Sequence, residues 1–357
     1  MRGPVRPALR FLRAGLAVAG LFFLCGVQDV RAVARATPVR PPSHSTAGSR
    51  GIVRLGGIEY VDAASFAKTL GLKATWLRAG KRLAIHNDNF RIELEANSRE
   101  AVVSGVRVFM GEGARVYKRT MRISKIDAER LLGPIARPGI SGARVPDLKI
   151  IALDAGHGGR DPGKENHKLK VNEKTFTLDV VRRLERLLTQ QGYKVVLTRK
   201  SDTYVELGDR PAIATKTGAD LFISIHFNAV ASNVERVSGT ETYTMTPQYQ
   251  RSASSEGRHS SDAIANPGNA NDNWNSLIGY HMQRSLLGDL KTSDRGMKHG
   301  RLAVLRLATC PAVLVEAGFL SNTAEARKIA TSAYRQKIAA SIADGVKAYR
   351  NALATAR

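Results

Sequence analysis

The stretch KIIALDAGHGGRDPGKENHKLKVNEK, residues 149–174, decides how the second half of this 357-residue chain folds. It begins with an unbroken apolar run, which is typical of a strand buried on both faces of a parallel sheet. A glycine-rich turn around His157 follows, and Glu173 opens the next amphipathic segment. The stretch therefore predicts a strand, a turn and a helix, with polar side chains held at the turn.

The same rhythm continues to the C terminus. Helical patterns are carried by EKTFTLDVVRRLERLLTQQG, RPAIATKTG, SLIGYHMQRSLLGDL and YRQKIAASIADGVKAY. Strand patterns are carried by YKVVLTR, ADLFISIH, GTETYTM and PAVLVEAG. This alternation predicts an α/β domain whose mostly parallel sheet is covered by helices on both faces.

Ligands of such folds gather where the parallel strands end. His226 ends the strand LFISIH, Glu316 ends AVLVE, and His157 follows the first strand. We expect these side chains to meet Glu173 at one edge of the sheet. Two imidazoles and one carboxylate suit zinc, with a fourth position left for water. A phosphate loop is excluded, because GHGGRDPG lacks the Lys-Ser/Thr ending of a P-loop and the spacing of a dinucleotide fingerprint.

Five blocks of the chain resemble, in order, those of the zinc-dependent N-acetylmuramoyl-L-alanine amidases of the type-3 class: DAGHGGRDPG, NEK, SIHFNA, RGMKHGRLAVLR and PAVLVEAGFLSN. The resemblance covers residues 149–357 and implies a mixed sheet of about six strands. It also implies one Zn²⁺ ion held by His157, Glu173 and His226, with Glu316 as the catalytic glutamate. The implied reaction is hydrolysis of the amide between N-acetylmuramic acid and L-alanine in peptidoglycan.

Two other functions stay open: a zinc peptidase that cuts within the stem peptide, and an inactive wall-binding protein. The net charge of +24, from 55 Lys and Arg against 31 Asp and Glu, favours anionic partners. We expect no nucleic-acid partner, since the chain has charge but no nucleic-acid-binding motif and begins with an export signal.

The first residues predict that export signal. Basic residues precede the apolar run 14–27, and small-residue triplets follow it, so residues 1–36 are expected to be a signal peptide. An uncleaved membrane anchor is the alternative. Cleavage would leave a protein of the periplasm or the cell wall and exterior, with no membrane attachment. It would also remove Cys25, so that Cys310 is left without a disulfide partner.

Residues 37–51, rich in Pro, Ser and Thr, predict a flexible linker. Residues 52–138 predict a small α+β module, which resembles the copper amine oxidase-like N-terminal domain. No cluster of copper ligands occurs in it, and His86 is expected to be an exposed or satisfied polar residue. The module could bind peptidoglycan, dock a partner or act as a spacer, and wall binding is the role we favour. The absence of heptads predicts a monomer.

Several further residues have two interpretations. Asp154 either orients a ligand imidazole or caps the glycine turn, and Asn228 either contacts substrate or holds its turn. Lys298 and Arg301 either bind stem-peptide carboxylates or are solvated. Four histidines are expected not to touch the metal, and Cys310 is expected to fill the core; the histidines are His167, His259, His281 and His299.

The segment 246–275 is rich in Ser, Asn, Gly and Pro and has few large apolar residues. Some amidases of this class carry an inhibitory helix after the strand of the second histidine, but this composition does not favour a docked helix. We expect a mobile loop beside the cleft that helps to hold substrate.

Overall fold

A computed structural model of the protein describes residues 51–357. The predicted signal peptide, residues 1–36, and nearly all of the predicted linker, residues 37–51, lie outside the described residues. Within the described part, no helix is both long and apolar enough to cross a bilayer.

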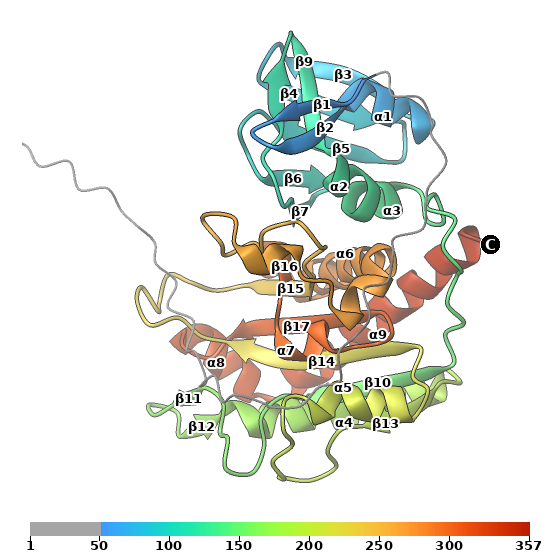
Figure 1. The fold of residues 1–357 in the computed structure, drawn as a ribbon. Coiled ribbons are helices and arrows are strands. Elements are labelled where there is room, and N and C mark those ends of the chain that lie inside the picture. The colour runs from blue at the N-terminus through green and yellow to red at the C-terminus, as the bar shows by residue number, and fades with distance from the viewer. Residues whose placement is uncertain (1–50) are drawn as a thin grey trace, which may run out of the picture.

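The N-terminal part is a small α+β unit, as the sequence predicts (Figure 1). Asp62 begins its first helix by accepting a hydrogen bond from the backbone N–H of Ser65. Its elements are β1 (Val53–Leu55), β2 (Ile58–Asp62), α1 (Ala63–Thr69), β3 (Lys73–Arg78), β4 (Arg82–His86), β5 (Arg91–Glu95), β6 (Glu100–Val103), β7 (Val106–Phe109), β8 (Arg115–Tyr117), β9 (Thr120–Ser124), α2 (Lys125–Asp127) and α3 (Gly133–Ala136), with a π-helical turn at Ala128–Leu132.

The C-terminal part begins at residue 150 and confirms the predicted alternation of strands and helices. The elements are β10 (Ile150–Ala155), β11 (Glu165–Asn166), β12 (Val171–Asn172), α4 (Glu173–Gln190), β13 (Lys194–Leu197), α5 (Asp209–Lys216), β14 (Leu221–Asn228), β15 (Thr240–Met245), 3-10 turns at Ser260–Ala263 and Pro267–Asn271, α6 (Asp272–Leu290), β16 (Asp294–Gly300), α7 (Ala303–Arg306), β17 (Ala312–Phe319), α8 (Thr323–Ala330) and α9 (Ser332–Thr355).

The sheet of this part contains six strands in the order β13-β10-β14-β17-β15-β16. The first four strands are parallel, and β15 is antiparallel to β17 but parallel to β16. The predicted mixed, mostly parallel sheet of about six strands is therefore confirmed. Because β10, β14 and β17 run in one direction, the residues at their carboxyl ends share one edge of the sheet.

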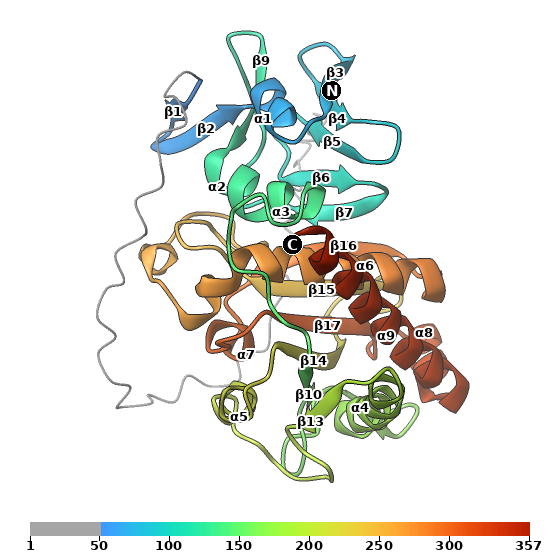
Figure 2. The ribbon, with the colours of Figure 1, turned by 90° about the vertical axis from the view of Figure 1, so that its right-hand side faces the viewer.

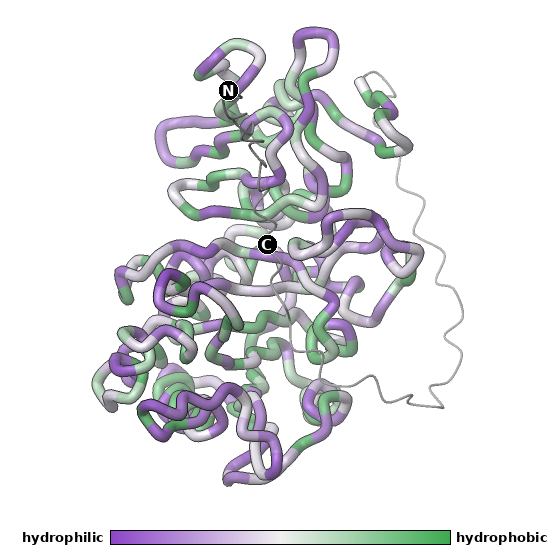
Figure 3. The backbone as a smooth tube through the Cα atoms, turned by 90° about the vertical axis from the view of Figure 1, so that its left-hand side faces the viewer, coloured by the Kyte–Doolittle hydropathy of each residue, from purple (hydrophilic) through white to green (hydrophobic). Residues whose placement is uncertain are grey.

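Helices cover both faces of this sheet, as Figure 2 shows. Alternate residues of a strand point to opposite faces. Ile151 and Leu153 of β10 pack under α4, α6 and α9, whereas Ala152 packs with residues of α5 and α7. The apolar residues of the strands are accordingly interior in Figure 3, and the loops around them are mostly hydrophilic.

The N-terminal unit is joined to the C-terminal part through a shared sheet. Strand β7 pairs in parallel with β16 through Val108 and Met297, so one sheet of eleven strands runs through both parts, continuing from β16 as β7-β6-β5-β4-β3. Tyr280 of α6 and Met297 of β16 belong to the apolar core of the N-terminal unit. This continuity was not predictable from the sequence, because DRGMKHG, residues 294–300, has no strand-like alternation.

Replacing Met297 by Ala should destabilise both parts together. The side chain is fully buried between the two cores, and truncating a buried Met to Ala costs about 2–5 kcal/mol. Denaturant unfolding should show this loss in a single transition. Ile264→Ala is the control, since that side chain is 58% exposed. A loss no larger than the control's would contradict the shared core.

Candidate functional site

His157 lies in the turn after β10, in a backbone conformation that a side chain of its size rarely adopts. Its φ is +62°, and Gly158, Gly159 and Gly163 around it also have positive φ. The backbones of Gly158 and Asp161 bond to each other at 2.9 and 3.1 Å, which closes the turn. The Asp161 carboxylate thereby reaches the His157 Nδ1 atom at 2.8 Å. This contact orients the ring so that Nε2 faces away from Asp161.

Glu173 is the first residue of α4 and is 4% exposed. Asn172 begins the helix as its N-cap, and the short hairpin β11–β12 leads the chain to that point. The backbone N–H of Lys164 donates to Glu173 Oε2 at 2.8 Å, and the N–H of Phe227 donates to Oε1 at 2.9 Å. A helix N-terminus and two amide donors thus hold this carboxylate in its charged form.

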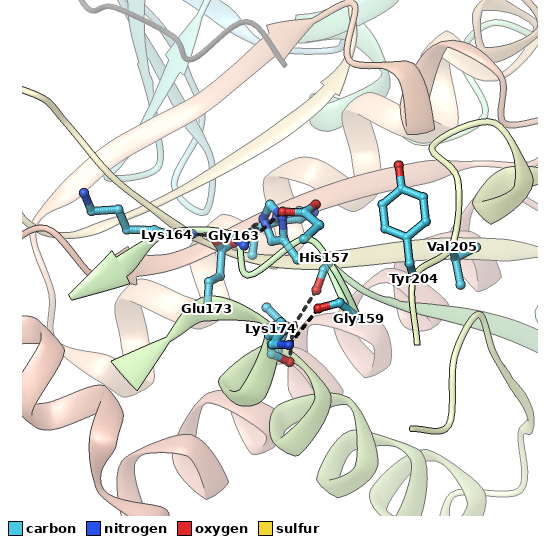
Figure 4. A network of polar contacts seen from close by, with 12 residues as sticks. His157, Gly159, Gly163, Lys164, Glu173, Lys174, Tyr204 and Val205 are labelled. Carbon is cyan, nitrogen blue, oxygen red and sulfur yellow. Dashed lines mark hydrogen bonds and ion pairs between the residues drawn. The ribbon is translucent and has the colours of Figure 1, made fainter. Parts of the chain in front are cut away.

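The imidazoles of His157 and His226 converge on Glu173, as the sequence predicts. Figure 4 shows His157 and Glu173 side by side. His157 Nε2 lies 3.1 Å and His226 Nδ1 3.0 Å from the same oxygen, Oε1. The ligand atoms of the three residues lie within 4.8 Å of one another, and within residues 51–357 no other group of His, Cys, Asp and Glu forms such a cluster.

The donor set fits a divalent cation. Burial alone lowers the pKa of His157, but hydrogen bonds to Asp161 and Glu173 outweigh it and raise the pKa to about 10. Burial alone raises the pKa of Glu173, but both histidines outweigh it and hold the pKa well below its usual range. The site therefore favours positive charge between these groups. A metal ion would supply that charge and accept lone pairs from neutral imidazoles.

Three cations bind the carbonyls of Ala155, Gly156, His157 and Gly159, and none of the three was predicted from the sequence. Arg199 donates to the first two of these carbonyls at 2.9 Å each. Arg210 donates to the carbonyl of His157 at 3.0 Å, and Lys174 donates to that of Gly159 at 2.8 Å, as Figure 4 shows. Both arginines are at most 3% exposed. These bonds stabilise the unusual backbone that places His157.

Asp154 neither orients a ligand imidazole nor caps the glycine turn, which are the two roles that the sequence suggested. Its carboxylate is fully buried and accepts from Thr198 at 2.7 Å, from Ser224 at 2.7 Å and from Arg210 at 2.9 Å. It supports His157 only indirectly, through Arg210. The residue that orients the imidazole is Asp161. Its place four residues after His157 was the available signal, since the turn GHGGRD brings the two side chains together.

Glu316 lies opposite His226 on β17, and across the antiparallel pair it faces Glu241 of β15. Its Oε2 atom is buried and has no hydrogen-bond partner among the described residues. Burial, together with the charges of Glu173 and Glu241, raises its pKa well above the usual range. A cation held by the triad would oppose this shift. Glu316 thus has a free carboxylate oxygen beside the triad, where a proton could be held.

Asn228 and Lys298 both bind Glu241, a buried carboxylate that the sequence analysis did not single out. Asn228 donates to it at 2.6 Å and Tyr243 at 2.9 Å, and the Lys298 ammonium pairs with its Oε2. Asn228 also accepts a bond from the N–H of Ala229, so it holds its own turn. Lys298 is therefore not simply solvated.

None of the other candidate residues belongs to the cluster of possible metal ligands found within residues 51–357. His167 and His259 are exposed, and burial lowers the pKa of His281 and His299 to about 4. Cys310 is buried in an apolar cluster, and burial raises its pKa to about 12. His86 contacts Thr75 at 3.1 Å.

The segment 246–275 is not beside the triad. Strand β15 runs antiparallel to β17, so this segment leaves from the opposite edge of the sheet. Arg99 of the N-terminal unit donates to the carbonyls of Ser252 at 2.9 Å and Ser255 at 3.1 Å. Arg301 is likewise neither solvated nor free for a stem peptide, because it pairs with Asp262 of the segment at 2.9 Å. The expected loop beside the cleft was wrong, since arginines tie the segment to the N-terminal unit.

Gly163→Ala should disrupt the triad without unfolding the chain. A Cβ atom at this position would lie 2.6 Å from His157 Cδ2 and 2.7 Å from Glu173 Oε2. We expect divalent-metal affinity, measured by competition with a chelating dye, to fall at least about tenfold. Gly192→Ala is the matched control, because Gly192 also has positive φ but no atom within 4 Å of the added carbon. Equal metal affinity in both variants would contradict the assignment.

Comparison with known proteins identifies the family of the C-terminal part. The N-acetylmuramoyl-L-alanine amidase family matches residues 151–348. N-acetylmuramoyl-L-alanine amidase AmiC of Escherichia coli O6:H1 is 32% identical over 63% of this chain and 59% of its own length. AmiA of Escherichia coli K12 is 31% identical over 56% of this chain and 76% of its own. The chain thus spans about three fifths of AmiC.

Among solved structures, the catalytic domain of the amidase CwlV from Bacillus (Paenibacillus) polymyxa var. colistinus is 33% identical, with a TM-score of 0.46, over 57% of this chain and 99% of that one. The family match spans more than half of the residues of this protein, and this chain therefore belongs to the N-acetylmuramoyl-L-alanine amidase family.

Proposed function

We propose that this protein is an exported zinc hydrolase that cleaves the amide between N-acetylmuramic acid and L-alanine in peptidoglycan. The observation that carries the proposal is the convergence of His157 and His226 on one oxygen of Glu173, with Glu316 beside them. Membership of the amidase family supports the substrate class. The N-terminal sequence supports export, and the absence of heptads supports a monomer.

His157, Glu173 and His226 would hold the zinc ion. When bound, zinc supplies the Lewis acidity that activates a water molecule and polarises the scissile carbonyl. Asp161 keeps the proton of His157 on Nδ1, so that Nε2 presents its lone pair to the ion. The amide donors of Lys164 and Phe227 keep Glu173 ionised.

Glu316 would move the proton. Its unpartnered Oε2 accepts a proton from the attacking water and gives it to the amine nitrogen of L-alanine as the C–N bond breaks. The products are a free muramic acid carboxylate and a free peptide amine. We assign the catalytic domain to residues 149–357 and the accessory unit to residues 52–138, for which wall binding and the copper amine oxidase-like resemblance stay predictions.

Glu316→Gln should lower the hydrolysis rate by about 10²–10⁴, because the amide cannot accept the proton. Divalent-metal content should stay that of the parent, since Glu316 holds no place in the triad. Chromatography of muropeptides measures the rate, and elemental analysis of the purified protein measures the metal. A variant that hydrolyses at the parental rate would remove Glu316 from the mechanism.

Chelation should abolish hydrolysis of purified peptidoglycan, and zinc should restore it in stoichiometric amount. In the control sample, the chelator is removed by dialysis before the assay and no metal is added. The released ends identify the bond: an amidase frees the amine of L-alanine and leaves intact muramic acid on the glycan. Peptide amines other than that of L-alanine would instead indicate a peptidase.

A further inference from the structure

The row of polar residues that begins at the triad does not stop at Glu316. His226, Glu316 and Glu241 lie opposite one another on β14, β17 and β15, so their side chains share one face of the sheet. Strands β15, β16 and β7 run opposite to β17, and their first residues therefore lie at the edge where β14 and β17 end. Figure 3 views the molecule from the side of this edge. The row thus continues towards the N-terminal unit.

Arg295, at the start of β16, is the next charged residue along this edge. Its Nε atom is buried without a hydrogen-bond partner among the described residues. The guanidinium lies over the Phe319 ring, 5.4 Å from its centroid, and 3.7 Å from Glu241 Oε2. Lys298 already pairs with that oxygen. Glu241 thus lies between two cations, with the carboxylate of Glu316 facing it across the strand pair. The Arg295 side chain is 37% exposed.

Arg107, at the start of β7, brings a second guanidinium from the N-terminal unit to this edge, where Glu100 pairs with it. It pairs with Glu100 at 2.7 Å and donates to the carbonyl of Asp294 at 3.1 Å, and its side chain is 40% exposed. Its guanidinium lies 5.6 Å from the centroid of Phe109, and the Lys298 ammonium lies at the same distance from that ring. Arg107 and Arg295 therefore belong to one continuous surface on two parts of the chain.

The spacing of the strands suits a short peptide. Neighbouring strands lie about 4.8 Å apart, so β16 is about 10 Å and β7 about 14 Å from β17. An extended peptide advances about 3.5 Å per residue. A peptide attached at the scissile bond beside Glu316 would therefore bring its third to fifth residues over Arg295 and Arg107.

We propose that Arg295 and Arg107 form a binding site for carboxylates of the stem peptide, so that the N-terminal unit contributes directly to substrate recognition. This inference rests on the proposed function. The guanidinium groups can form charge-assisted hydrogen bonds to a carboxylate, and the aromatic rings of Phe319 and Phe109 beneath them limit their solvation. The ligand class is an acidic peptide linked to muramic acid.

The test compares Arg295→Gln and Arg107→Gln with the parent on two muramoyl peptides. One carries free carboxylates beyond the scissile bond, and the other carries carboxamides at the same positions. We expect each variant to raise KM for the carboxylate form about three- to tenfold, with kcat within about twofold of the parent. The carboxamide form should show no difference between variants and parent. Arg186→Gln, on the exposed side of α4, controls for the loss of one positive charge.

Equal KM values of the parent for both peptides, or variants that raise KM for both alike, would overturn the carboxylate site. The carboxamide peptide also separates recognition from misfolding, because a damaged variant would fail on both. Should the parent hydrolyse neither peptide, the proposed function fails, and fluorescence anisotropy then tests the site by itself. The labelled carboxylate peptide must still bind the parent more tightly than Arg295→Gln, or the inference falls too.

Discussion

One buried carboxylate oxygen organises the centre of this protein. Glu173 Oε1 lies within hydrogen-bond distance of His157, His226 and the N–H of Phe227. A charged group that is 4% exposed is costly unless every direction around it is compensated. The hairpin β11–β12, the start of α4 and the end of β14 must all arrive at the same place to provide that compensation. The edge of the sheet is therefore fixed by electrostatics as much as by apolar packing.

The geometry of the His157 turn follows from the same constraint. A histidine with positive φ is strained, and the strain is held by cations that bind the carbonyls around it. Arg210 is itself buried and paired with Asp154, so the turn is anchored to the interior of the sheet. Each of these buried charges is compensated by a neighbour. Asp154 in the core pairs with Arg210, and Arg210 binds the carbonyl of His157 at the site.

Features of the fold and the site that depend on local sequence patterns could be predicted, whereas contacts between residues far apart in the chain could not. Apolar runs and helical periodicity predicted the alternation of strands and helices, and the rule for strand ends brought His157, Glu173, His226 and Glu316 together. Contacts made by long polar side chains left no periodic signal, which is why Arg199, Arg210 and Glu241 were missed. The union of the two parts was also unpredictable, since it depends on Val108 pairing with Met297 across 189 positions. The segment 246–275 was misplaced for a related reason: its anchors are long-range arginine contacts, such as those of Arg99 with the carbonyls of Ser252 and Ser255.

The position of Cys310 has a practical consequence. It is the single thiol of residues 51–357, and it is 8% exposed in the cluster under α5 and α7. The thiol borders a surface pocket that Trp274 and Pro311 also line, and burial raises its pKa to about 12, so a sulfhydryl reagent reacts with it faster when this layer opens. Once the predicted signal peptide and its Cys25 are removed, the rate of thiol labelling therefore reports local opening at this one position.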